Sequence, residues 1–133
     1  MDIETGQATP RSPVSVALHF RGHELVQDKP AASGGKDEGP MASEYLLASL
    51  LACQHSTFVK VAAKRKAAVS LKGLEGELGF VDGDIAAVRV RFDVKADAAT
   101  TDDAIATLVR LTDKTCTISK ALKLPVEGTF RRV

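Results

Sequence analysis

Residues 34–66, GGKDEGPMASEYLLASLLACQHSTFVKVAAKRK, decide the fold of this chain. The stretch opens as a charged, glycine-rich loop, passes a proline, and continues as an apolar run rich in leucine and alanine. Its large apolar residues recur at the spacing of one broad helix face: Leu46, Leu47, Leu50, Leu51, Phe58 and Val61. Ser43 is the expected helix cap, and Glu44 in the first turn complements the helix dipole. We therefore predict a long central helix that ends near Lys66, with Cys53 at the edge of its apolar stripe.

Strands are predicted on both sides of this helix, from alternating apolar residues and a tight Asp-Gly-Asp turn. In chain order we expect strands over 14–20 and 23–28, the long helix, a hairpin of strands over 69–80 and 85–95, a helix over 99–114, a short helix over 116–122 and a strand over 126–133. Strands in runs separated by helices predict an α+β fold with antiparallel sheets. We expect a loose lead-in over residues 1–13 and a single domain over 14–133.

Composition narrows the classes of partner. The 133 residues carry 18 Lys and Arg against 17 Asp and Glu, and no block of like charge stands out. We therefore expect neither nucleic acid nor a membrane as a partner. The N-terminus lacks the apolar core of a signal peptide, and no stretch approaches the roughly 18 apolar residues of a membrane span. A cytoplasmic location is expected, where cysteines are kept reduced.

The chain has two cysteines, Cys53 in the long helix and Cys116 at the head of the short one. A reactive thiol needs a lowered pKa, which a helix N-terminus or a nearby cation provides. Cys116 has a helix start, whereas the activation of Cys53 has to come from a side chain delivered by another element. If the fold brings them together, a sulfenic acid on one can be captured by the other as a disulfide. The alternative is two small, inert core residues. The cysteines and the three histidines lack the clustering of metal ligands, so we expect no metal and no other cofactor.

Three segments together carry a family resemblance: GGKDEGP at 34–40, SEYLLASLLAC at 43–53 and CTISKAL at 116–122. In order and spacing they resemble the OsmC/Ohr family of organic hydroperoxide reductases, and the likeness covers essentially residues 14–133. The resemblance implies an intertwined homodimer with a site at each subunit interface. It also implies that Cys53 is the peroxidatic nucleophile, that Cys116 is the resolving cysteine, and that a dithiol such as a lipoyl group is the reductant.

Two positions depart from the family pattern. The family places a carboxylate directly after a proline, ten residues before the nucleophile, where this chain has Ser43 after Ala42. Glu44 is the nearest candidate, and its alternative role is that of a first-turn partner of the helix dipole. The family's arginine also has no counterpart in the glycine-rich loop, so Arg21, in an early turn, is the candidate for substrate binding.

These departures leave other functions open. One is an OsmC-like dimer that binds a small apolar or thiol-reactive ligand with little or no peroxidase turnover. Another is an interaction protein in which both thiols are inert core residues. The main hypothesis remains oxidative stress defence by a two-cysteine thiol peroxidase acting on organic hydroperoxides.

Overall fold

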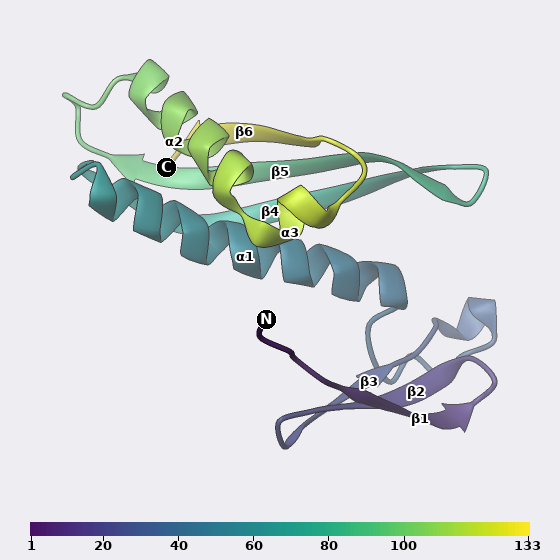
Figure 1. The fold of residues 1–133 in the computed structure, drawn as a ribbon. Coiled ribbons are helices and arrows are strands. Elements are labelled where there is room, and N and C mark those ends of the chain that lie inside the picture. The colour runs from purple at the N-terminus through teal and green to yellow at the C-terminus, as the bar shows by residue number, and fades with distance from the viewer. The chain divides into compact units, whose positions relative to one another are not determined.

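The computed structural model describes residues 1–133, which form two compact units, Met1–Leu46 and Leu47–Val133. Each unit has its own three-stranded sheet. Helix α1, Ala42–Lys64, starts in the first unit and continues through the second (Figure 1). The predicted long helix is therefore present, and it begins at Ala42, one residue before the expected cap.

The first unit is built on an antiparallel sheet in the order β1-β2-β3. Its strands are β1 Gln7–Ser12, β2 Ser15–Phe20 and β3 His23–Gln27. The last two confirm the predicted strands. The prediction of a loose lead-in over residues 1–13 is wrong for the part that forms β1, where Pro10 pairs with Val16. Proline has no N–H to donate to a ladder, but β1 is an edge strand, where this loss is tolerated.

Asp28 organises the loop that leads from β3 to α1. Its side chain is buried, and its carboxylate accepts hydrogen bonds from the backbone N–H groups of Lys29, Lys36 and Glu38 at 2.7, 3.1 and 3.1 Å. The loop also contains a short 3₁₀ helix, Ala31–Ser33. The backbone of Gly35 lies so close to the backbone of Lys29 that a Cβ at Gly35 would be 1.9 Å from the Lys29 carbonyl oxygen. Asp28 thus ties three points of the glycine-rich loop together.

The second unit combines a three-stranded sheet with the helices. Its further elements are β4 Val69–Val81, β5 Asp84–Ala96, α2 Asp102–Thr115, α3 Thr117–Ala121 and β6 Val126–Arg132. The predicted β4–β5 hairpin is antiparallel, which confirms that part of the fold. The expectation of purely antiparallel sheets is wrong for β6, which pairs with β5 in parallel. A parallel pair needs a long crossover, and α2 and α3 supply it.

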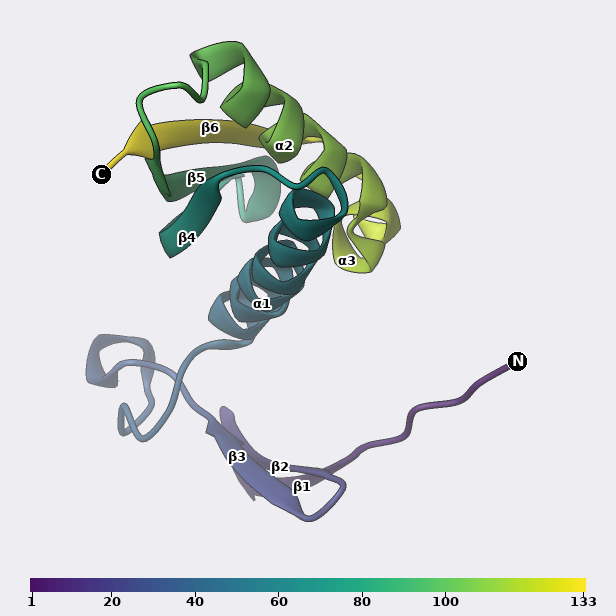
Figure 2. The same cartoon turned by 90° about the vertical axis from the view of Figure 1, so that its left-hand side faces the viewer.

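The helices of this unit cover one face of the sheet. In Figures 1 and 2, α1, α2 and α3 lie on the same side of β4, β5 and β6. Every second residue of β5 is buried toward them: Val88, Val90, Phe92 and Val94. Phe58 of α1 lies against Phe92 with ring centroids 5.4 Å apart. The core cluster continues through α2 to Cys116 and Val126.

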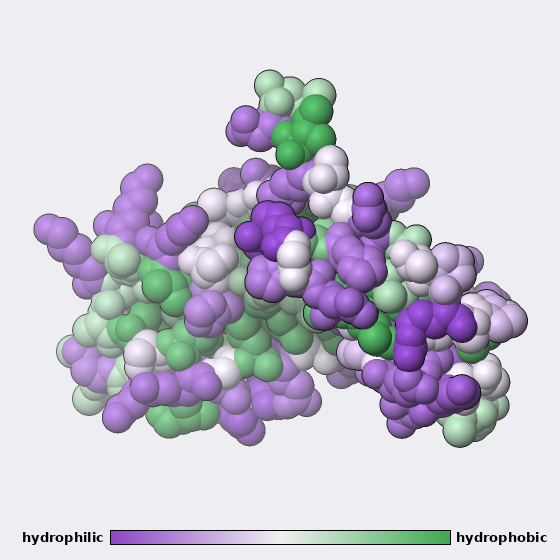
Figure 3. All heavy atoms as spheres, turned by 90° about the horizontal axis from the view of Figure 1, so that it is seen from below, coloured by the Kyte–Doolittle hydropathy of each residue, from purple (hydrophilic) through white to green (hydrophobic).

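Helix α1 buries few of its residues. Those that are buried follow each other at a spacing of four: Leu50, Gln54, Phe58 and Ala62. On the opposite side, Ala48, Ala52, Val59 and Ala63 are exposed. Hydrophobic residues, green in Figure 3, lie at the surface between hydrophilic ones in the left-hand part of that view.

By length and composition alone, α1 could also cross a membrane, with a mean hydropathy of 1.3 over its most apolar window. The expectation that no stretch of the sequence is long and apolar enough to span a membrane is therefore wrong. Such a helix is weak evidence of a membrane span, because the core helix of a soluble protein has the same length and composition.

Candidate functional site

The second unit brings the two cysteines together. Cys53 lies in the middle of α1, and Cys116 lies 63 positions later at the N-cap of α3. The Cys116 thiol donates to Cys53, with the two Sγ atoms 2.6 Å apart. Cys116 is fully buried, whereas Cys53 is partly accessible to solvent. This arrangement suits an outer thiol that meets a reactant and an inner thiol that meets only its partner.

The surroundings of the two thiols shift their pKa values in opposite directions. Burial acts to raise the pKa of Cys53, but hydrogen bonds outweigh it and lower the pKa. These bonds come from the Cys116 thiol, the N–H groups of Ile118 and Thr117, and the Thr57 hydroxyl. Burial and the bond to Cys53 raise the pKa of Cys116. Since the thiolate is the nucleophilic form of cysteine, the lowered pKa favours Cys53 over Cys116 as a nucleophile.

The donors that lower the pKa of Cys53 are all neutral. The sequence predicts that a side chain delivered by another element activates Cys53. Instead, the start of α3 places backbone N–H groups at the Cys53 sulfur, together with the Cys116 thiol. Hydrogen bonding to the charged form of a group favours that form without any nearby charge.

A buried amide lies next to the thiol pair. Gln54, of which 1% is exposed, donates from Nε2 to Ser119 Oγ at 2.7 Å and to Asp113 Oδ1 at 3.3 Å. The backbone N–H of Ser119 donates in turn to Cys116 Sγ at 3.4 Å. One side chain of α1 thus connects α2 and α3 directly behind the cysteines.

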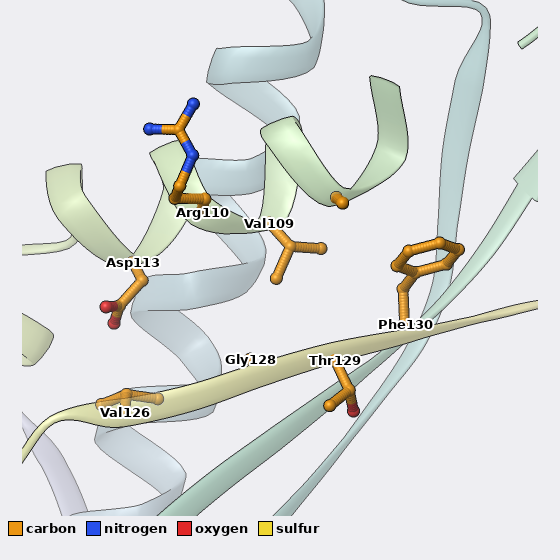
Figure 4. A pocket seen from close by; sticks show the side chains of 8 residues that line it. Val109, Arg110, Asp113, Val126, Gly128, Thr129 and Phe130 are labelled. Carbon is orange, nitrogen blue, oxygen red and sulfur yellow. The ribbon is translucent and has the colours of Figure 1, made fainter. Parts of the chain in front are cut away.

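Asp113 also lines a groove of about 450 Å³ between α2 and β6. Figure 4 shows Val109 on α2 above Gly128 on β6, with Arg110 and Asp113 further along the helix. A Cβ at Gly128 would lie 2.7 Å from Val109 Cγ1, so the absence of a side chain there lets the helix approach the strand.

The two other candidates, Glu44 and Arg21, belong to the unit Met1–Leu46, whereas the groups that bond the thiols come from Leu47–Val133. The Glu44 carboxylate accepts the N–H of Met41 at 2.9 Å and so caps the start of α1. Arg21 is exposed in the turn between β2 and β3, with a φ of 49°. The structure therefore brings Cys53 and Cys116 together and gives Glu44 a capping contact.

Gln54 was missed by the sequence reasoning, although a signal for it exists. It interrupts the row of four-residue spacing from Leu50 to Phe58, where a helix facing a core should carry an apolar residue. A buried polar side chain is expected to have hydrogen-bond partners. Its position next to Cys53 pointed to the site; its partners, 59 and 65 positions away, could not be read from the sequence.

The sequence model of a family described as OsmC-like protein matches residues 35–131 of this chain. No curated protein matches the sequence closely enough to count as a relative. Solved structures match the fold along nearly the whole chain. An OsmC-like protein of unknown function from Vibrio cholerae aligns over 98% of this chain and 100% of its own, with 18% identity and a TM-score of 0.80.

The organic hydroperoxide resistance protein OhrB of Bacillus subtilis aligns over 97% of this chain and 98% of its own, with 19% identity and a TM-score of 0.67. A proposed organic hydroperoxide resistance protein from Vibrio cholerae, with captopril bound in one of its active sites, covers 99% of this chain and 93% of its own. Its identity is 19% and its TM-score 0.64. At such identities the likeness concerns the fold, and the match over 35–131 establishes the family: this chain belongs to the OsmC-like proteins.

Proposed function

We propose that this protein is a thiol peroxidase that reduces organic hydroperoxides by a two-cysteine mechanism. The observation that carries the proposal is the thiol pair itself, with Sγ atoms 2.6 Å apart, one partly accessible and one buried. The opposite pKa shifts support Cys53 as the nucleophile and Cys116 as the resolving cysteine. Oxidative stress defence is consistent with the hydroperoxide resistance proteins among the structural neighbours.

The reaction has two steps on the protein. The Cys53 thiolate attacks the terminal oxygen of the hydroperoxide, an S–O bond forms, and the O–O bond breaks. The alkoxide takes a proton and leaves as an alcohol, so the peroxide gains the two electrons that the sulfur loses. Cys116 then loses its proton and attacks the sulfenic sulfur. The S–S bond forms, the S–O bond breaks, and hydroxide leaves as water after taking up a proton.

An external dithiol closes the cycle. A lipoyl-type dithiol reduces the disulfide by exchange and is itself oxidised to a disulfide. Partly buried apolar residues that pack on the same core as Cys53 include Leu51, Ile118 and Leu122. Such surroundings favour an organic hydroperoxide over hydrogen peroxide. A cytoplasmic location is part of the proposal, because a disulfide that is reduced again in each cycle needs a reducing compartment.

The proposal includes an intertwined homodimer. Two apolar surfaces of the single chain support it. One is the face of α1 that carries Ala48, Ala52, Val59 and Ala63. The other lies on the β2–β3 hairpin, where Phe20 and Leu25 are 43% and 42% exposed. Because large exposed apolar surfaces mark interaction sites, a second copy that covers them is the occupant we propose.

Arg21 and Glu44 enter this proposal as the residues that bind the peroxide and assist at the thiolate. A catalytic role for either requires that the dimer bring it to a Cys53 thiolate. For Glu44 it also requires that the carboxylate leave the Met41 N–H. Arg21 has the planar guanidinium that binds oxyanions in a bidentate manner.

A second candidate function is the binding of a small apolar or thiol-reactive ligand with little turnover. It is favoured by the neutral character of the main donors to Cys53, which are the Cys116 thiol, two backbone N–H groups and the Thr57 hydroxyl. The Vibrio cholerae neighbour that holds captopril in an active site shows that a protein of this fold binds a small molecule there.

The two candidates separate in a consumption assay. The protein is mixed with cumene hydroperoxide and dihydrolipoamide, and loss of peroxide is followed against the Cys53→Ser variant. We expect catalytic consumption by the wild type only, and slower consumption of hydrogen peroxide. Loss of less than one peroxide per chain, with Cys53 still alkylated selectively, would favour the ligand-binding function.

A further inference from the structure

The two-cysteine reaction leaves the role of Gln54, a buried side chain next to the thiol pair, unassigned. It occupies a buried position in a row of otherwise apolar residues, between Leu50 and Phe58. Burying an amide costs free energy unless its polar atoms are hydrogen bonded. Gln54 meets this requirement through Asp113 and Ser119, and Ser119 in turn contacts Cys116, which connects the amide to the thiol pair.

The orientation of the Gln54 amide is fixed by its partners. The Asp113 carboxylate can only accept, so the NH₂ group of Gln54 must face it. This NH₂ group has two hydrogens, and its second contact is Ser119 Oγ at 2.7 Å. Since the amide donates, the serine oxygen accepts.

The Ser119 hydroxyl hydrogen is thereby left to donate elsewhere. Burial and the Cys116–Cys53 contact raise the pKa of Cys116, while the backbone and the side chain of Ser119 both act to lower it, as expected for donors to sulfur. The Ser119 backbone N–H reaches the same sulfur at 3.4 Å. Cys116 in turn donates its own hydrogen to Cys53. Gln54 thus donates to Ser119, the N–H of Ser119 donates to Cys116, and Cys116 donates to Cys53.

We propose that Gln54 is a positioning residue for disulfide closure: by holding Ser119, it directs a hydroxyl donor at the Cys116 sulfur as that sulfur becomes the attacking thiolate. Closure requires Cys116 to lose its proton in a buried place, where a thiolate is disfavoured. The Ser119 hydroxyl and N–H stabilise the thiolate there, and Gln54 keeps the hydroxyl from turning away. The inference rests on the proposed roles of the two cysteines, and its test is independent of peroxide turnover.

Closure is measured with the aromatic disulfide DTNB. The Cys53 thiolate attacks DTNB, releases one thionitrobenzoate and forms a mixed disulfide. Cys116 then attacks the Cys53 sulfur of this disulfide, and a second thionitrobenzoate leaves. The two releases are followed at 412 nm by stopped flow as two phases. The first phase reports the nucleophile, and the second reports closure.

The variants are Gln54→Met, which keeps the volume without the amide, and Ser119→Ala, which keeps the N–H without the hydroxyl. We expect each variant to slow the second phase by about three- to tenfold, which is the rate change that corresponds to the loss of one hydrogen bond. The rate of the first phase should stay within about twofold of the wild-type rate. The double variant should be no slower than Ser119→Ala, because both substitutions break one chain. Ser119→Thr, which keeps a hydroxyl, should restore the second phase.

The control is Ser56→Ala, since Ser56 also lies near Cys53 on α1 but its hydroxyl contacts only the Cys53 carbonyl oxygen. It should leave both phases unchanged. An unaltered second phase in Gln54→Met or Ser119→Ala would overturn the inference, as would equal slowing of both phases or additive effects in the double variant. If the wild type closes its disulfide with DTNB but ignores cumene hydroperoxide, the proposed peroxidase fails while the role of Gln54 stands.

Discussion

At the scale of residues, the hydrogen bond between the thiols helps to separate their pKa values. Cys116 donates to Cys53 and thereby helps to lower the pKa of Cys53. We expect Cys116→Ala to raise that pKa, because the thiolate loses a donor. At any pH below the inflection the thiolate fraction then falls, and alkylation of Cys53 slows.

The measurement is the rate of iodoacetamide alkylation against pH, read at Cys53 by peptide mass spectrometry. The inflection should move to higher pH in Cys116→Ala and less in Cys116→Ser, where a hydroxyl donor remains. Identical inflections in all three proteins would show that the Cys116 thiol does not stabilise the Cys53 thiolate.

At the scale of elements, Asp28 is predicted to hold the loop before α1 in a pH-dependent way. Backbone hydrogen bonds from Lys29, Glu38 and Lys36 lower the pKa of its carboxyl group despite burial. The stabilisation is therefore fully present above the unfolded-state pKa and is lost as the pH falls through the lower, folded-state pKa. Asp28→Asn should lower the melting temperature at pH 7, and the difference from the wild type should shrink in acid.

Thermal unfolding of both proteins at a series of pH values checks this prediction. The difference between the two melting temperatures isolates Asp28 from the other carboxyl groups, which titrate in both proteins. A constant difference from pH 7 to pH 2.5 would mean that the Asp28 charge does not hold the loop.

A second prediction at this scale concerns the contact of α2 with β6. Because a Cβ at Gly128 would lie 2.7 Å from Val109 Cγ1, Gly128→Val should force α2 away from the strand. Overpacking of this kind costs about 1–3 kcal/mol of unfolding free energy. The control is Gly73→Ala on the same sheet, whose Cβ would meet only ordinary contacts at 3.6 Å. Equal stability of the two variants in urea unfolding would contradict the close approach.

The elements themselves could largely be predicted from the sequence, because their patterns are local. The spacing of apolar residues such as Leu50 and Phe58 predicted α1, and the helix predicted over 99–114 is present as α2, with Thr101 as its cap. Strand β1 was missed because Pro10 is typical of loops, and only its edge position makes it compatible with a strand. The parallel pairing of β6 was also missed, since the direction of a strand depends on the path of α2 and α3 and not on its own residues.

The candidate site could be predicted only in part for the same reason. The two cysteines and the helix start at Cys116 were visible in the sequence. The hydrogen bonds that separate their pKa values join α1 to α3 across 63 positions, and no local pattern encodes such contacts. Asp113 and Ser119 could be placed at the site only from their hydrogen bonds to Gln54 in the structure.

At the scale of the whole molecule, the exposed apolar face of α1 predicts self-association. One chain has a mass of 14.1 kDa, and light scattering after size exclusion should give twice this value. Ala52→Glu places a charge in the middle of that face and should shift the protein toward the monomer, because burying an unpaired charge is costly. Lys95→Glu, exposed on β5, is the matched control and should remain dimeric. A wild-type monomer at all concentrations would contradict the dimer.

The central claim is that Cys53 and Cys116 form a catalytic pair, and mass spectrometry after one equivalent of cumene hydroperoxide tests it most directly. The reduced wild type should convert to an intramolecular Cys53–Cys116 disulfide, two mass units lighter, since two hydrogens are lost. Cys116→Ser should instead carry a sulfenic acid on Cys53 that dimedone traps, and Cys53→Ser should stay reduced. If both thiols of the wild type remain reduced under these conditions, the protein is not a two-cysteine peroxidase.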